Sequence, residues 1–201
     1  MKVRACSICG TDLHSYRLGE EEILARLPEG QTKTHGFYGA IGNLRGGGHQ
    51  IAGDIVEICP DTSKWSVGDR VAGVVAGGYA EYCNMDRICR LPDALSYEEG
   101  SYVEPLAVGV VAVRRSGLRL DDTAVVLGAG PIGQFTLQCA KVAGAMVIVT
   151  EVTPKRIELA KLFANEVVNV GMVDAVKRVR ELTGGDSPSV IFECAGRYET
   201  M

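Results

Sequence analysis

Hydrophobic and polar positions follow two different patterns along the 201-residue chain, and the change comes near residue 105. In the first part, 1–104, short apolar runs alternate with turn residues, which is typical of a small β-rich unit. A Gly-Asp pair within VGDRV (67–71) gives a hairpin-like turn signal between two of these runs. The predicted strands of this part are 50–58, 69–75 and 79–85.

The second part, 105–201, alternates buried-strand runs with helical segments. Pro131 and Pro154 stand in the first turns of two predicted helices, where a missing N–H is tolerated. Apolar residues recur at helical spacing through 173–182 in a third helix, which Gly184 ends. This alternation predicts an α/β fold with a parallel sheet and right-handed crossovers. The predicted strands are 123–128, 146–151, 166–170 and 189–196.

The segment GAGPIG (128–133) fits the pattern G-x-G-x-x-G. Alone this is a weak signal, but here it follows a strand, opens a helix and precedes a second strand that ends in Glu151. The glycines permit a tight turn, backbone approach to a pyrophosphate and close helix packing, and the helix N-terminus attracts phosphate. The alternative is a glycine-rich turn that binds nothing. The candidate dinucleotide-binding residues of the motif are Gly128, Gly130, Pro131, Ile132 and Gly133.

Glu151 adds a preference between dinucleotides. A carboxylate at this strand end accepts hydrogen bonds from the adenosine ribose hydroxyls and repels a 2′-phosphate, which favours NAD over NADP. Lys155 and Arg156 follow closely and weaken that preference, and Arg156 is assigned to the same candidate site. The alternative for Glu151 is a solvated strand end.

Charge and cysteine content narrow the class of protein. The chain has 21 basic and 25 acidic residues, a net charge of −4, which gives no support for a nucleic-acid or anionic-membrane partner. No apolar run approaches the roughly 20 residues that span a bilayer. Seven cysteines are an odd number without paired spacing, so reduced thiols in a cytoplasmic setting are expected.

The stretch CSICGTDLH (6–14) carries the second candidate site. Its Cys-x-x-Cys spacing fits a zinc knuckle, a thioredoxin-like dithiol, or part of a site completed elsewhere. A dithiol needs the motif to open a helix after a strand, whereas a loop is expected here. A structural zinc needs a second suitable pair, which Cys83 and Cys89 do not supply. The third interpretation is therefore favoured.

Three further stretches, GGGHQIAG (46–53), GDRV (68–71) and EPLAV (104–108), follow CSICGTDLH and precede VLGAGPIG. In this order they resemble the zinc-dependent medium-chain alcohol and polyol dehydrogenases. The resemblance implies a partial β-rich, GroES-like catalytic zinc domain over 1–104 and a partial Rossmann domain, a doubly wound parallel sheet that binds NAD, over 105–201. The implied reaction is hydride transfer between NAD and a secondary alcohol, polyol or amino-alcohol.

The resemblance assigns the catalytic zinc to Cys9, His49 and Glu104. One thiolate, one imidazole and one carboxylate, with a position open to water, is also the composition of a catalytic rather than a structural zinc site. The alternatives are a satisfied histidine beside a glycine turn for His49 and a strand-end carboxylate for Glu104.

The same resemblance gives roles to three residues around the metal. Thr11 receives the proton of the substrate alcohol, Asp12 orients His49, and His14 passes the proton toward solvent. The alternatives are a turn threonine and a surface histidine. Cys6 is implied to be a packing residue on a strand.

The sequence also departs from the family. Gln50 replaces the usual glutamate after the histidine, the stretch 20–47 with His35 is longer than usual, and the lobe with four cysteines for a structural zinc is absent. Family members have further strands before the metal loop and after 193–196, so we expect a shortened form with four Rossmann strands. Two alternatives therefore remain, an inactive dinucleotide- and zinc-binding fragment and a zinc-free quinone reductase. The resemblance also implies a homo-oligomer.

Overall fold

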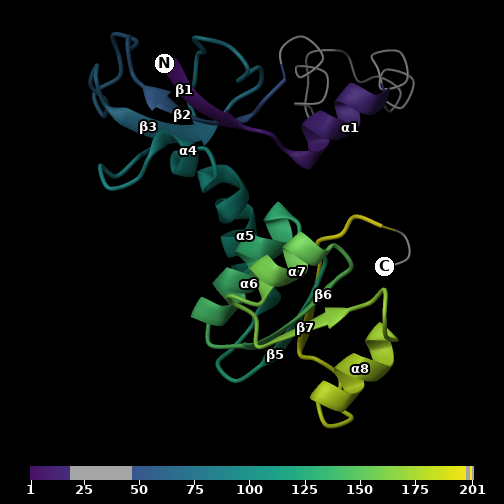
Figure 1. The fold of residues 1–201 in the computed structure, drawn as a ribbon. Coiled ribbons are helices and arrows are strands. Elements are labelled where there is room, and N and C mark those ends of the chain that lie inside the picture. Colours follow the sequence, from purple (N-terminus) through teal and green to yellow (C-terminus); the bar gives the residue numbers. More distant parts are fainter. Residues whose placement is uncertain (19–46, 198–199, 201) are drawn as a thin grey trace, which may run out of the picture. The chain divides into compact units, whose positions relative to one another are not determined.

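The computed structural model describes residues 1–18, 47–197 and 200. The stretch 20–46, which holds His35, lies outside the described residues. The chain divides into two compact units, Met1–Glu104 and Pro105–Met201, which are described separately (Figure 1). No helix in the described part of the chain is long and apolar enough to cross a membrane.

The first unit is built on an antiparallel sheet in the order β1-β2-β3-β4. Its strands are β1 (Lys2–Ser7), β2 (Gln50–Asp54), β3 (Arg70–Val74) and β4 (Ile88–Arg90). The register pairs Ser7 of β1 directly with Gln50 of β2. The two residues therefore place their side chains together on one face of the sheet.

Two helices of this unit position its polar residues: α1 (Gly10–Leu18), into which β1 leads in Figure 1, and the short α4 (Tyr97–Gly100). A capping box fixes the start of α4, since Ser96 and Glu99 exchange side chain–backbone hydrogen bonds. Gly100 sits so close to the sheet that an added Cβ would lie 2.9 Å from atoms of Ala52 and Leu91. Because α4 lies this close to the sheet, Ser101 comes within hydrogen-bonding distance of Ser7.

The structure differs from the expectations for this unit in three places. The segment 79–85 forms no strand; it makes a single bridge, between Tyr82 and Lys2, because it meets only the short outer edge of β1. A helix, α1, follows Cys9 where a loop was expected. Asp12 stabilises its first turn by accepting the N–H of the capping residue, Cys9, at 2.8 Å. The predicted strand 50–58 is also shorter, ending at Asp54.

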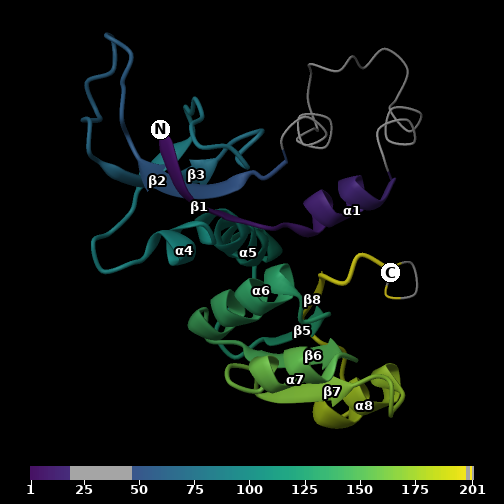
Figure 2. The same ribbon diagram turned by 45° about the horizontal axis from the view of Figure 1, so that its top comes forward.

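The second unit is a parallel sheet in the order β7-β6-β5-β8, with helices between consecutive strands (Figure 2). It confirms the predicted α/β alternation and each predicted strand, with ends that differ by a few residues. Its elements are α5 (Val103–Ser116, which begins in the first unit), β5 (Thr123–Leu127), α6 (Pro131–Val142), β6 (Met146–Glu151), α7 (Pro154–Ala160), β7 (Glu166–Asn169), α8 (Ala175–Leu182) and β8 (Val190–Glu193).

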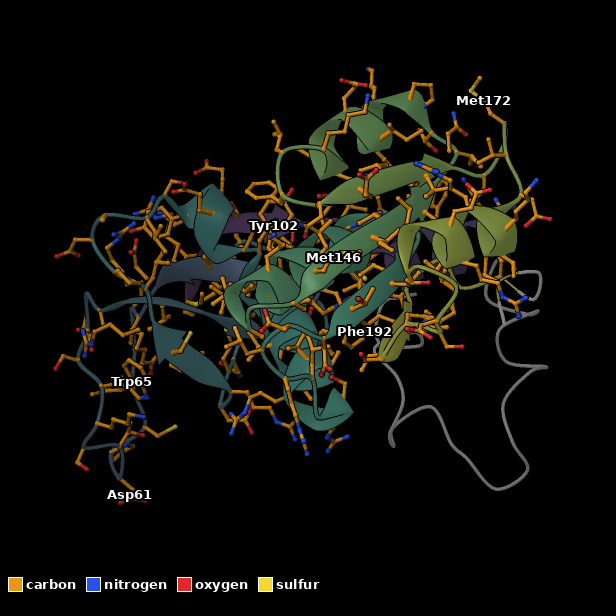
Figure 3. The ribbon with its side chains drawn as sticks, turned by 90° about the horizontal axis from the view of Figure 1, so that it is seen from below. Asp61, Trp65, Tyr102, Met146, Met172 and Phe192 are labelled. Carbon is orange, nitrogen blue, oxygen red and sulfur yellow. The ribbon has the colours of Figure 1, made fainter. Side chains whose placement is uncertain are left out.

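The central strands β5 and β6 bury both faces, as their continuous apolar runs predict, whereas the edge strands β7 and β8 are partly exposed. One face packs against α5, α6 and α7, and the other packs against α8 through Val179 and Leu182. Figure 3 labels one residue from each face, Phe192 and Met146. Val176, which shares the predicted helical spacing, is 65% exposed, so only part of that apolar stripe is buried.

The turn from β5 to α6 is the tightest point of the second unit. Gly128 has φ +89°, a conformation that a side chain disfavours, and its N–H donates to Thr150. A Cβ on Gly133 would lie 2.0 Å from the carbonyl oxygen of Gly128. The helix can approach the strand this closely only with glycine at position 133.

We expect Gly133→Ala to destabilise the second unit by about 1–3 kcal/mol, because the added methyl forces α6 away from β5. Urea denaturation followed by circular dichroism measures this change. The matched control is Gly130→Ala in the same turn, where a Cβ meets only the Arg156 guanidinium at 4.0 Å. Equal stability of the two variants would contradict the assigned close approach.

Candidate functional site

Asp12 anchors the candidate metal site of the first unit. Its buried carboxylate accepts hydrogen bonds from the N–H of Cys9 at 2.8 Å, the N–H of Gly48 at 3.1 Å and the hydroxyl of Tyr79 at 3.1 Å. These donors come from three segments that are distant in the sequence. The carboxylate thus fixes the turn after β1 against the residues that lead into β2.

Cys9 and His49 meet as a consequence. Hydrogen bonding between their side chains lowers the pKa of the Cys9 thiol and raises the pKa of the His49 imidazole, against the opposing effect of burial on each. Asp12 Oδ1 lies 3.9 Å from Nδ1 of His49. At this distance the carboxylate attracts the Nδ1 side of the ring by its charge, and Nε2 would be left for a metal.

The two proposed proton-transfer residues, Thr11 and His14, both belong to α1. The hydroxyl and the N–H of Thr11 both contact the Cys9 thiol and contribute to lowering its pKa. Thr11 is exposed, so its hydroxyl is also accessible to a small molecule. His14 belongs to α1, but its side chain lies outside the described residues.

Glu104 is held by a different partner. Gln50 Nε2 donates to Glu104 Oε2 at 2.8 Å, and Gln50 Oε1 accepts from the hydroxyl of Ser7 at 2.8 Å. The charge of Glu104 reaches His49, where it contributes to raising the imidazole pKa. Across the described ranges, no three His, Cys, Asp or Glu side chains form a group that could hold a metal ion. The structure brings Cys9 and His49 together as a pair, and it holds Glu104 on a separate hydrogen bond to Gln50.

The donor set fits zinc in its chemistry. A thiol with a lowered pKa next to an imidazole offers the soft sulfur and nitrogen ligands that Zn²⁺ prefers. Asp12 behind the imidazole is the usual arrangement for a metal-binding histidine. Cys9, His49 and Glu104 would hold the metal, with Glu104 joining them from its contact with Gln50.

Cys6 stands apart from this site. It lies on β1 and pairs with Ile51 across the sheet, and an added Cβ on Gly48 would fall 2.7 Å from its sulfur. Burial, followed by the charge of Asp12, raises the pKa of the Cys6 thiol to about 11. Although a helix does follow the Cys-x-x-Cys motif, the neighbouring sheet is antiparallel and both thiols are free. The geometry therefore gives Cys6 the environment of a packing residue.

The glycine turn of the second unit has the features of a phosphate cradle. Gly130 precedes α6 as its N-cap with no side-chain capping bond, and space is open where a Cβ would stand. Pro131 follows at the first helical position, exposed, and Ile132 is half-buried. The first-turn N–H groups of a 12-residue helix face this opening and attract phosphate.

Glu151 closes the same turn. Its carboxylate accepts the N–H groups of Ala129 at 2.9 Å, Val152 at 2.7 Å and Thr153 at 2.9 Å. Burial alone would raise its pKa, but these donors outweigh burial and lower it. Arg156 Nη1 lies 3.7 Å from Glu151 Oε2 and is half exposed. The structure thus places a fixed negative charge and an accessible cation beside the glycine turn.

Sequence reasoning missed two residues of the first site. Tyr79 donates to Asp12, and Ser7 donates to Gln50. No sequence motif around Tyr79 predicts its hydrogen bond to Asp12. The pairing of Ser7 with Gln50 depends on the strand register, which no local motif defines.

The contrast between the two motif thiols gives a test in metal-free protein. Near neutral pH we expect iodoacetamide to modify Cys9 more than about tenfold faster than Cys6, because only the thiolate reacts and the two pKa values are shifted in opposite directions. Peptide mass spectrometry gives both rates from one sample. His49→Ala should slow the modification of Cys9 and leave the modification rate of Cys6 unchanged. Similar rates at both thiols would refute the assigned contact.

Gly130→Ala tests the phosphate cradle. We expect it to weaken dinucleotide binding about tenfold or more, because the methyl occupies the space that a pyrophosphate needs. The stability change should stay below about 1 kcal/mol, since the position is an N-cap with open surroundings. Isothermal titration with NAD measures the affinity, and an unchanged value would exclude Gly130 from the site.

Comparisons with known proteins agree with both halves of the structure. Residues 1–115 match the family model of the alcohol dehydrogenase GroES-like domain, and residues 131–201 match that of zinc-binding dehydrogenases. The chain is 33% identical to (R,R)-butanediol dehydrogenase from Bacillus subtilis (strain 168), over 98% of this chain and 63% of the relative. It is 31% identical to sorbitol dehydrogenase from the same organism, over 98% of this chain and 61% of the relative.

A solved structure with a bound dinucleotide is also similar. A zinc-binding dehydrogenase family protein from Sinorhizobium meliloti 1021, determined bound to NADP, superposes with a TM-score of 0.79 at 27% identity, over 99% of this chain and 63% of the other. The chain thus spans about three fifths of the length of the relatives it matches. The motifs, the two sheets and these matches together place the chain in the zinc-dependent medium-chain alcohol and polyol dehydrogenase family.

Proposed function

We propose that the chain belongs to a zinc-dependent, NAD-linked oxidoreductase of a secondary alcohol, polyol or amino-alcohol. The observation that carries the proposal is the contact of the Cys9 thiol with the His49 imidazole, with Asp12 on the Nδ1 side of the ring. When bound, zinc supplies Lewis-acid polarisation of the alcohol oxygen and NAD supplies the hydride acceptor.

The residues of the chain have separate roles in this proposal. Cys9, His49 and Glu104 hold the metal, and Asp12 keeps the imidazole in one orientation. Thr11 is exposed next to Cys9 and receives the proton of the alcohol, which His14 passes toward solvent. The similarity to a butanediol and a sorbitol dehydrogenase supports a diol or polyol as the substrate class.

In the second unit, the turn through Gly128, Gly130 and Gly133 binds the pyrophosphate, with Pro131 and Ile132 beginning the helix behind it. Glu151 repels a 2′-phosphate, which favours NAD. The exposed Arg156 guanidinium acts in the opposite direction, and a similar structure carries NADP. We assign NAD because the Glu151 charge is fixed by three backbone N–H donors.

A catalytically inactive zinc- and dinucleotide-binding module is the second candidate, because Glu104 is hydrogen-bonded to Gln50 and no three acidic, histidine or cysteine side chains of the described residues form a metal-holding group. A zinc-free quinone reductase is disfavoured, because Cys9, His49 and Asp12 are retained and joined by contacts. The dehydrogenase and the inactive module both require binding of zinc and a dinucleotide, and only the dehydrogenase turns over an alcohol.

Metal analysis of the purified protein should find about one zinc per chain, because the donor set matches one catalytic site. Cys9→Ser and His49→Ala should each abolish zinc binding without unfolding the protein. The matched control is Cys59→Ser, a substitution of an exposed free thiol. Folded protein that binds no zinc would refute the proposal.

Absorbance at the NADH band with butane-2,3-diol and sorbitol then separates the two candidates. Turnover that depends on zinc supports the dehydrogenase, and NAD binding without turnover supports the inactive module. A parallel titration with NADP compares the two affinities. Tighter binding of NAD indicates that Glu151 sets the preference, and tighter binding of NADP indicates that Arg156 does.

A further inference from the structure

Two buried polar side chains link β1 to the candidate metal site. Ser7 is 9% exposed and Gln50 is 3% exposed, and they are direct partners across β1 and β2. The hydroxyl of Ser7 lies 2.8 Å from Gln50 Oε1 and 3.1 Å from the carbonyl oxygen of Ser101. A buried amide needs partners on both of its ends, and Ser7 supplies the partner for the oxygen.

The other end of the amide meets a carboxylate, and this determines its orientation. Glu104 can only accept hydrogen bonds when ionised, so the NH₂ group of Gln50 must face it, as the 2.8 Å contact to Oε2 requires. The amide oxygen then faces Ser7, whose hydroxyl must donate. The reversed amide would place two acceptor oxygens against each other, so the three residues form a chain with one favourable direction.

The amide also makes position 50 different from what the family resemblance implies. A glutamate there would place two carboxylates side by side, and like charges at this distance repel. Gln50 replaces that repulsion with a charge-assisted hydrogen bond, which is stronger than a bond between neutral groups. The charge of Glu104 sets which end of the Gln50 amide faces it, and the hydrogen bond from Ser7 to the amide oxygen holds the amide, and with it the Glu104 carboxylate, in place.

We propose that Ser7 and Gln50 are positioning residues for Glu104, and that a hydroxyl in β1 thereby controls how tightly the site of Cys9 and His49 holds its metal. This inference rests on the proposed function, because it requires Glu104 to act as a zinc ligand. Ser7 makes no described hydrogen bond to Cys9 or His49, and its hydrogen-bonded route to the site runs through Gln50 to Glu104. Partners behind a metal ligand typically change metal affinity ten- to a hundredfold, roughly.

A double-mutant cycle tests the route. Zinc affinity is measured by chelator competition for the unaltered chain, Ser7→Ala, Glu104→Ala and the combined variant. We expect Ser7→Ala to weaken zinc binding about tenfold in the unaltered background and not at all in the Glu104→Ala background. The visible absorption of bound Co²⁺ should change in Ser7→Ala, because it reports ligand geometry.

The control is Ser116→Ala, which removes a half-buried hydroxyl that donates to the carbonyl of Val113 in the second unit. It should leave zinc affinity and the Co²⁺ spectrum unchanged. If Ser7→Ala does not fold, Gln50→Met takes its place in the cycle: it removes the donor to Glu104, and Ser7 keeps the carbonyl of Ser101 as an acceptor.

The outcomes separate the inference from the proposed function. Equal weakening by Ser7→Ala in both backgrounds indicates a general structural effect and overturns the inference. Unchanged affinity and spectrum in Ser7→Ala also overturn it, while zinc binding that depends on Cys9 leaves the proposed function standing. No zinc binding by the unaltered chain overturns both.

Discussion

The buried carboxylate of Asp12 is the contact on which the candidate metal site depends. Burial of an ionised carboxylate is costly unless hydrogen-bond donors surround it, and here the donors are the N–H groups of Cys9 and Gly48 and the hydroxyl of Tyr79. Satisfying this one group therefore brings together the end of β1, the start of β2 and the segment after β3. The meeting of Cys9 and His49 is a geometric consequence of that requirement.

Glu151 plays the same physical part in the second unit. It accepts three backbone N–H groups, one from the glycine turn after β5 and two from the turn after β6. The two strands end side by side in a parallel sheet, so their turns must meet, and an acidic residue at the end of β6 stabilises both. Each unit thus uses a buried carboxylate to connect two backbone turns, and each candidate site lies on such a connection.

The two units differ in how far sequence reasoning could go. Parallel strands buried on both faces give continuous apolar runs, so the four strands of the second unit and the helices between them were predicted, whereas α5, which carries Glu104 in its first turn, was not. The first unit has short strands, and its outer pairings are set by register: Tyr82 reaches β1 through one bridge and the segment 79–85 forms no strand. The helix α1 was missed because its start depends on Asp12 and Cys9, a capping arrangement that lacks the usual serine or threonine.

The same distinction explains the candidate sites. Motif spacing identifies residues near each other in the sequence, such as Gly128 and Gly133, whose close contact follows from one turn. It cannot reveal that Ser7 lies opposite Gln50, because a shift of one residue in register would turn one of the two side chains to the other face. The link from Ser7 to Glu104 therefore exists only through the folded sheet. A glutamate at position 50 would repel the Glu104 carboxylate. The Gln50 amide instead donates a hydrogen bond to it, and Ser7 holds that amide in place.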